Sequence, residues 1–169
     1  VQTCALPILR CYSVSVVPIR KEGSEALYLL LRRRGGALDG SWCLISGCIE
    51  LGETAWRAAV RELKEETGLN PIELYSADTC DQFYDFGKEI VSIIPAFVAL
   101  LDPSKEVVVD EEHSDHRWCT LQEAQDLVAF GGQRNLIKFV QQEFVDRQPL
   151  KTLRIPVVIP EDEPPPFSR

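Results

Sequence analysis

The stretch GCIELGETAWRAAVRELKEETGL, residues Gly47–Leu69, is the part of the chain from which the fold is worked out most directly. Glu62, Glu65 and Glu66 lie three and four residues apart, which places them along one edge of a helix. Like charges at this spacing repel each other and destabilise an isolated helix. A divalent cation would remove the repulsion, because hard cations bind clusters of carboxylate oxygens. The stretch therefore predicts a helix that carries a metal site on one edge.

The other side chains of this helix follow the pattern of an element that faces a core. Thr54 is a suitable N-cap, Gly68 suits the helix end, and Pro71 follows as a stop, so the helix is expected to run from Thr54 to about Thr67. At 3.6 residues per turn, its side chains separate into three stripes. These are an apolar stripe of Trp56, Ala59, Val60 and Leu63, a basic edge of Arg57, Arg61 and Lys64, and the acidic edge.

Strand-like segments and further helices surround this helix. A capping box of Thr120 and Glu123 predicts one of those helices. This order of elements predicts an α/β (α+β) fold, an α/β/α sandwich with a mixed sheet between helices. The expected strands are residues 12–19, 26–33, 42–46, 72–77, 79–86, 89–101, 107–110 and 116–120, and the final amphipathic helix is marked by Leu136, Ile137, Val140 and Phe144.

One domain is expected over residues 10–147. Residues 1–8, VQTCALPI, back-translate to the end of a common sequencing adaptor, and the chain contains no methionine. We therefore interpret residues 1–9 as translated adaptor or a disordered N-terminus and exclude them from the fold. Residues 148–169 are rich in proline and acidic side chains, which predicts an extended or disordered tail.

Charge and cysteine usage narrow the expected partners. The chain has 26 acidic against 18 basic residues and a net charge of −8, which argues against non-specific nucleic-acid binding. A phosphorylated substrate is compatible with this charge, since metal ions bridge acidic sites and phosphate. No apolar run is long enough for a membrane span, so no membrane partner is expected. The six cysteines lack metal-binding spacing and are interpreted as buried thiols of a cytoplasmic protein, either a monomer or a homodimer.

The glutamate-rich stretch resembles the signature of the Nudix hydrolases. Gly47 is followed after five residues by Glu53 and after seven more by RELKEETGL, which matches every defining position. The segments SGCIELGETAW, ADTCDQFYD, EEHSDHRW and GQRNLIKFV are similar to the bacterial dATP pyrophosphohydrolase and dihydroneopterin triphosphate pyrophosphatase group. The chain departs from many Nudix proteins before the glycine, where Ile45 and Ser46 replace Pro-Gly or Pro-Lys.

The resemblance implies roles for the residues of the signature. Metal ligands would be Glu62, Glu65 and Glu66 together with the backbone carbonyl of Gly47, and the metal would be Mg²⁺, with Mn²⁺ as a substitute. Arg61 would orient a glutamate through a bidentate pair. Glu53 would hold the loop against the helix, and Gly68 would be structural.

Candidate residues also lie outside the signature. Nudix enzymes often supply a further carboxylate from a later loop, and in Asp110–Glu112, beside His113, we select Glu112 as ligand or general base. Arg32 is a candidate for a terminal phosphate of the substrate. Gln82 and Tyr84 are candidates for the wall of a base pocket.

The sequence supports several functions, of which one is preferred. The preferred function is a Mg²⁺-dependent pyrophosphohydrolase that converts a nucleoside triphosphate, such as dATP, or dihydroneopterin triphosphate to a monophosphate and pyrophosphate. The alternatives are hydrolysis of a nucleoside diphosphate derivative such as ADP-ribose or a dinucleoside polyphosphate, and nucleotide sensing without catalysis. An isopentenyl diphosphate isomerase would require Cys43 or Cys48 as a catalytic thiol.

Overall fold

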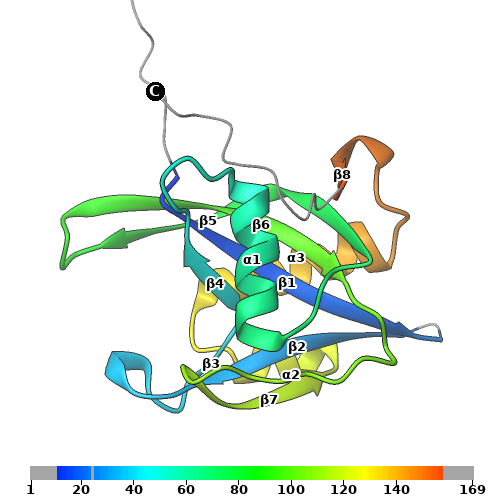
Figure 1. Cartoon of the computed structure of the whole chain (residues 1–169), viewed down its shortest axis with the longest axis horizontal. Helices are drawn as coiled ribbons and strands as arrows, with labels where there is room; N and C mark the ends of the chain where they lie inside the picture. The colour runs from blue at the N-terminus through cyan, green and yellow to red at the C-terminus, as the bar shows by residue number, and fades with distance from the viewer. Residues whose placement is uncertain (1–10, 24, 158–169) are drawn as a thin grey trace, which may run out of the picture.

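A mixed β-sheet lies between helices in the computed structural model, which describes residues 11–23 and 25–157 (Figure 1). The strands follow the order β3-β2-β1-β6-β5-β8, while β4 pairs with β1 and β7 pairs with β2. The pair β1–β6 is parallel, and the other strand pairs are antiparallel. The strands are β1 Ser13–Glu22, β2 Glu25–Arg33, β3 Trp42–Cys43, β4 Ile45–Cys48, β5 Glu73–Asp85, β6 Ile90–Leu100, β7 His113–Cys119 and β8 Arg154–Ile155.

The helices cover both faces of this sheet, which confirms the predicted sandwich. In β1, Val14 and Val16 belong to the hydrophobic cluster beneath α1, whereas Val17 and Ile19 belong to the cluster beneath α3. Successive strand residues point to opposite faces, so a strand that is apolar throughout is buried from both sides. The helices are α1 Ala55–Thr67, α2 Leu121–Leu127, α3 Gly131–Val140, the π-helical turn η2 Gln141–Val145, and the 3₁₀ turns η1 Gly36–Leu38 and η3 Lys151–Leu153.

The helix ends agree with the predicted caps in two of three cases. Gly68 has φ 71° and its N–H donates to the Lys64 carbonyl at 2.8 Å, which ends α1 as expected. Thr120 and Glu123 form the predicted capping box of α2. Thr54 stands at the N-cap position of α1, but its side chain makes no capping hydrogen bond and its Oγ1 is buried without a partner in the described part of the chain.

The predicted final amphipathic helix is present. Leu136, Ile137, Val140 and Phe144 are all buried in the cluster beneath α3. They lie on one continuous helical segment, because η2 extends α3 past Val140. In the described residues no helix reaches the length and hydrophobicity that a membrane span requires.

Two of the predicted strands are in fact one, and a third is absent. Residues 72–77 and 79–86 form the single strand β5, in which a bulge shifts the register between Ser76 and Cys80. Asp78 in this bulge has φ 55°, a conformation that Asp tolerates better than most residues. Residues 107–110 form no strand. They lie beside the C-terminal end of α1, where the Val108 N–H donates to the Thr67 carbonyl at 2.9 Å.

The C-terminal segment and the cysteines differ in part from what the sequence predicted. Residues 1–9 and the tail beyond residue 157 lie outside the described residues. Within the expected tail, β8 pairs with Leu74 and Tyr75 of β5 and so extends the sheet. Among the described thiols Cys43 and Cys119 are buried as expected, whereas Cys48 and Cys80 are exposed.

Candidate functional site

Arg61 is the centre of a charge network on α1. Its Nε and Nη2 donate to the two carboxylate oxygens of Glu53 at 3.0 Å each, and Nη2 also donates to the Cys48 carbonyl at 2.8 Å. Its Nη1 donates to Glu62 at 2.7 Å and to Glu65 at 3.0 Å. Arg61 therefore lies among the glutamates and relieves part of their repulsion, instead of belonging to a separate basic edge.

Glu53 connects the loop to the helix. One of its carboxylate oxygens accepts a hydrogen bond from the Glu50 N–H at 3.0 Å, and both accept from Arg61. The side chain is 14% exposed. These contacts connect the loop between β4 and α1 to the helix, and the structural role of Glu53 stays a prediction.

Gly47 and Glu62 are in direct contact. A Cβ added at position 47 would overlap the Glu62 carboxylate, so the contact requires glycine. The Glu62 side chain is only 13% exposed, and this burial raises its pKa, against the opposing effect of Arg61. The β4–α1 junction thus positions a partly desolvated carboxylate against the backbone of Gly47.

Glu66 is the most buried carboxylate of this edge. Its side chain is 7% exposed, and its Oε2 has no hydrogen-bond partner in the described part of the chain. Burial, and then the nearby charges of Glu62 and Asp110, raise its pKa to about 8, although Arg33 and a backbone hydrogen bond from Ser46 act in the opposite direction. An unpartnered buried carboxylate oxygen is costly, and a bound cation would offset that cost.

His113 lies between Asp110 and Glu66. His113 is fully buried at the start of β7, and its Nδ1 lies 2.7 Å from Asp110 Oδ1. The opposite ring nitrogen, Nε2, lies 3.8 Å from Glu66 Oε2 and has no hydrogen-bond partner in the described part of the chain. The histidine therefore connects the loop after β6 to the buried carboxylate of α1.

Glu112 is not among the residues that the structure brings to this cluster. Its side chain is 70% exposed, and its ion pair, at 3.7 Å, is with Arg33. Asp110 Oδ1 accepts a hydrogen bond from the Glu112 N–H at 3.1 Å and another from His113 Nδ1 at 2.7 Å. These two bonds form a turn in which the Asp110 side chain points toward the buried His113. In this structure Asp110 occupies the place beside Glu66 that we expected for Glu112.

Arg32 is likewise placed away from the acidic edge. Strand alternation in β2 puts Leu29 and Leu31 in the cluster beneath α1, so Arg33 projects on that face and Arg32 on the other. Arg32 is exposed and its Nε donates to the Gly40 carbonyl at 3.2 Å. The alternation of apolar residues along β2 was the signal that could have identified Arg33 instead.

Gln82 and Tyr84 lie in the outer half of the β5–β6 hairpin, which extends beyond the body of the sheet in Figure 1. Gln82 lines a hollow of about 460 Å³ with residues of α3, on the opposite face of the sheet from α1. Tyr84 is 57% exposed. No contact places either residue beside the glutamates within the described chain, so their assignment to a base pocket remains a prediction.

Asp110→Asn is expected to lower kcat more than Glu112→Gln. The first change removes the carboxylate that holds His113 against Glu66, and loss of such an outer partner typically costs about 10- to 100-fold in metal affinity or activity. The second change removes an exposed charge with a long ion pair to Arg33, so activity should stay close to that of the unmodified protein. Steady-state kinetics at saturating Mg²⁺ measures both.

Glu111→Gln, which changes a neighbouring exposed carboxylate, is the matched control for this pair. A large loss in Glu112→Gln with normal activity in Asp110→Asn would contradict the assignment to Asp110. It would mean that the loop moves when substrate binds and brings Glu112 to the cluster.

The comparisons with known proteins agree with this geometry. A family model described as NUDIX domain matches residues 9–140, and the chain therefore belongs to the Nudix family. An octanoyltransferase of Myxococcus xanthus is 34% identical over 79% of this chain, which spans only 37% of that protein. An asymmetrical bis(5'-nucleosyl)-tetraphosphatase of Caenorhabditis elegans is 27% identical over 75% of this chain and 91% of its own length.

A solved structure extends this similarity to the fold. The dihydroneopterin triphosphate pyrophosphohydrolase of E. coli has a TM-score of 0.63 and 25% identity over 81% of this chain and 99% of its own. The Nudix fold that the resemblance implied is therefore confirmed, whereas the similar proteins differ in the substrates that their names state.

Proposed function

We propose that the protein is a Mg²⁺-dependent pyrophosphohydrolase of a nucleoside triphosphate, such as dATP or another dNTP, or of dihydroneopterin triphosphate. The products would be a monophosphate and pyrophosphate. The observation that carries the proposal is the buried Glu66 carboxylate near Glu62, whose Oε2 has no hydrogen-bond partner among the described residues, within an intact Gly47–Leu69 signature.

The residues present suit a hard divalent cation. Glu62, Glu66 and the Gly47 carbonyl offer oxygen donors, and Glu66 Oε2 lacks any other partner in the described chain. Glu65 is the most solvent-exposed of the three glutamates, with 57% of its side chain exposed. Mg²⁺ typically takes one or two carboxylates and completes its shell with water and substrate phosphates. Mn²⁺ prefers the same donors.

The carboxylates of Glu62, Glu65 and Glu66 do not meet at one point in this structure. Across residues 11–23 and 25–157, no group of three or more His, Cys, Asp or Glu side chains is arranged to hold a metal ion. Arg61 accounts for this in part, because it binds both Glu62 and Glu65. Each of these two glutamates uses one carboxylate oxygen for Arg61, Oε1 of Glu62 and Oε2 of Glu65, so its second oxygen is left for a cation.

Each residue of the cluster then has a distinct task. A bound Mg²⁺ supplies charge that activates water and neutralises phosphate oxygens. Arg61 and Glu53 fix the loop that follows Gly47 and the rest of β4, and the Ser46 backbone holds Glu66. Arg33, which faces the same side as Glu66, is placed to meet a substrate phosphate. His113 and Asp110 position Glu66 from behind.

One alternative substrate class has support of its own. The name of the Caenorhabditis elegans relative states a dinucleoside tetraphosphate substrate. This chain aligns with 91% of that relative's length. The isomerase alternative is not favoured. Burial, and then Glu66, raise the pKa of the buried Cys43 to about 11, so its thiol stays protonated.

Product analysis separates the substrate classes. Incubation with dATP, dihydroneopterin triphosphate, a dinucleoside tetraphosphate and ADP-ribose in Mg²⁺ is expected to release pyrophosphate from a triphosphate at the highest kcat/KM. Chromatography of the products and an enzyme-coupled pyrophosphate assay measure this. Parallel reactions with excess EDTA should show no turnover.

A preference for ADP-ribose, with two monophosphates and no pyrophosphate as products, would contradict the triphosphate proposal but keep the hydrolase. Loss of all turnover on the panel, combined with tight nucleotide binding, would instead favour nucleotide sensing.

A further inference from the structure

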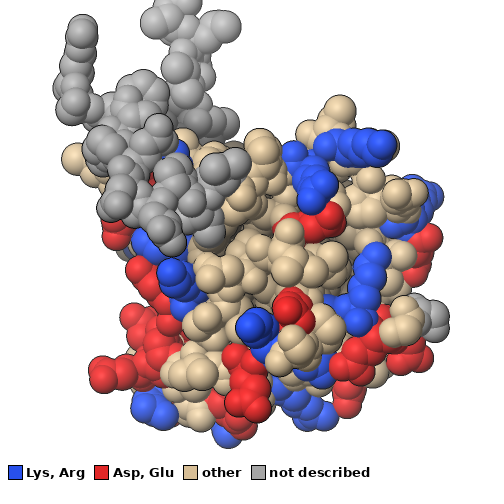
Figure 2. Space-filling view, turned by 45° about the vertical axis from the view of Figure 1, so that its right-hand side comes forward, with Lys and Arg blue, Asp and Glu red and all other residues tan. Residues whose placement is uncertain are grey.

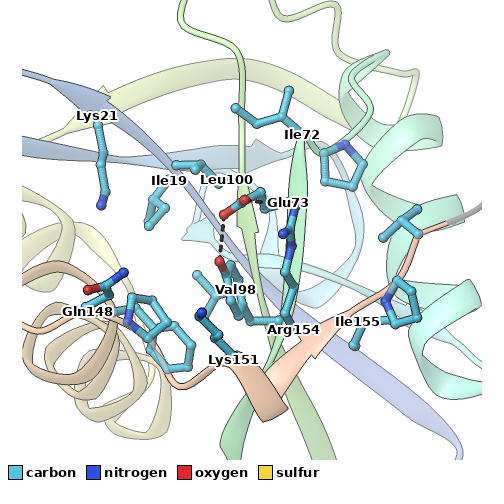
Figure 3. A pocket seen from close by; sticks show the side chains of 16 residues that line it. Ile19, Lys21, Ile72, Glu73, Val98, Leu100, Gln148, Lys151, Arg154 and Ile155 are labelled. Atoms are coloured by element: carbon cyan, nitrogen blue, oxygen red, sulfur yellow. Dashed lines mark hydrogen bonds and ion pairs between the residues drawn. The ribbon is translucent and has the colours of Figure 1, made fainter.

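A hollow of the described structure lies away from the glutamates. It has a volume of about 1000 Å³ and opens where the end of β1 meets β5, β8 and the segment after η2 (Figure 3). Its accessible apolar lining is formed by Ile72, Tyr75, Leu100 and Ile155, in front of the buried Ile19, Val98 and Phe144. Small-molecule sites are typically concave, largely apolar and roughly 300–1,000 Å³ in volume. The hollow therefore has the size and lining of a ligand site.

Positive charge dominates the polar part of this hollow. Lys21, Lys151 and Arg154 line it, against the single carboxylate of Glu73. Glu73 is already engaged twice, since it accepts from the Tyr75 hydroxyl at 2.6 Å and pairs with Arg154 at 2.9 Å. Lys21 and Lys151 form no ion pair with any described residue. Among the described residues, these two ammonium groups therefore have no carboxylate partner, in a chain of net charge −8.

The side chains converge on the hollow from different elements. Figure 3 shows Lys21 and Gln148 on one side of it and Lys151 below, while Arg154 lies alongside Glu73. Figure 2 shows Lys and Arg side chains projecting at the upper right of the face it draws, with a few acidic side chains among them, and a mixture of acidic and basic side chains along the lower part. A local excess of positive charge in an acidic protein attracts anions selectively.

This hollow is separate from the candidate active site. None of Glu62, Glu65 and Glu66 lines it. Three of its apolar residues, Val98, Ile19 and Phe144, are in the cluster beneath α3, whereas α1 packs on the other cluster. A ligand here would not need to contact the glutamates of α1.

We propose that this hollow is a second binding site, which takes a small aromatic phosphate. A phosphate monoester carries about −1.5 to −2 charges at neutral pH, which matches Lys21 and Lys151, neither of them ion-paired with a described residue. The aromatic body would lie on the apolar lining beside Tyr75, whose ring packs edge-to-face on the buried Phe144 at 5.9 Å between centroids. The site goes beyond the proposed hydrolysis and requires no metal.

The test is an NMR titration of the full-length, ¹⁵N-labelled protein with phenyl phosphate, in EDTA and at constant ionic strength. Saturable shifts are expected at Lys21 and over residues 148–155. Lys21→Ala combined with Lys151→Ala should weaken binding by about tenfold or more, because both ion pairs are lost. Lys105→Ala combined with Lys138→Ala, which changes the net charge equally at exposed positions outside the hollow, should bind like the unmodified protein.

Inorganic phosphate and phenol, titrated separately, are each expected to bind more weakly than phenyl phosphate. Equal affinity of inorganic phosphate would exclude the apolar lining, and equal binding by the Lys21 and Lys151 double variant would exclude the lysines. Shifts confined to residues 45–66, or no saturable shifts, would also overturn the proposal. If the double variant does not fold, the two single variants make the same comparison. Failure here leaves the hydrolysis proposal intact, since that is measured with Mg²⁺ at the other site.

Discussion

Glu66→Gln is expected to lower kcat by about two orders of magnitude or more while the protein stays folded. Glutamine keeps the shape of the side chain but removes the charge that a divalent cation requires. Loss of a residue that hydrogen-bonds a metal ligand already lowers metal affinity or activity by about 10- to 100-fold. Loss of the ligand itself should lower kcat by more than that. Steady-state kinetics at saturating Mg²⁺ measures the effect, and a near-normal rate would exclude Glu66 as a metal ligand.

The same substitution should stabilise the metal-free protein at high pH. The pKa of Glu66 is raised from 4.5 to about 8 by burial, so the folded state binds the proton more tightly than the unfolded state. Between these values the free energy of unfolding falls as pH rises, and the loss is complete above about pH 8. At about 1.4 kcal/mol per pKa unit, Glu66→Gln should recover on the order of a few kcal/mol above pH 8.

Urea unfolding in EDTA at pH 5, 7 and 9 measures this dependence. Glu111→Gln, which alters an exposed carboxylate, is the control and should leave the pH profile unchanged. If Glu66→Gln and the unmodified protein lose stability in parallel as pH rises, then Glu66 is not the buried titrating group.

Gly47→Ala is expected to have the second large effect. The new Cβ would overlap the Glu62 carboxylate, which therefore has to move. Glu62 is held by Arg61 at 2.7 Å and is mostly buried, so its displacement disturbs the network that also includes Glu53. We expect a loss of kcat of at least about tenfold and weaker Mg²⁺ affinity, with overpacking costing roughly 1–3 kcal/mol of stability.

Mg²⁺ binding by calorimetry, kinetics and urea unfolding together test this prediction. Gly131→Ala is a matched control, because a Cβ there meets its nearest atom, on Arg134, at an ordinary 3.8 Å. Normal Mg²⁺ affinity and kcat in Gly47→Ala would show that the contact between Gly47 and Glu62 is not needed for the site.

Features that depend on neighbouring residues were predictable from the sequence. The periodicity of α1, the terminating Gly68 and the capping box of α2 are all present in the structure. The amphipathic segment that ends at Phe144 is also present. Each results from backbone geometry over a few residues, which fixes the face that a side chain occupies within its own element. The bulge at Asp78 was harder to predict from the sequence, because two short strands and one bulged strand show the same alternation of apolar and polar residues.

Features that depend on which elements meet required the tertiary structure. Residues 107–110 have the composition of a strand, but the Val108 N–H donates to the end of α1 and so the segment does not join the sheet. That path directs Asp110 toward His113 and Glu66 and leaves Glu112 exposed.

The sequence by itself therefore determined the Nudix fold, the α1 helix and the glutamates along its edge. Only the tertiary structure decided that Arg61 lies among those glutamates, that Arg33 and not Arg32 shares their face, and that Lys21 and Lys151 border one hollow. The reason is physical. Local periodicity orients a side chain within its helix or strand, whereas its partners come from segments distant in the chain and are selected by packing of the whole core.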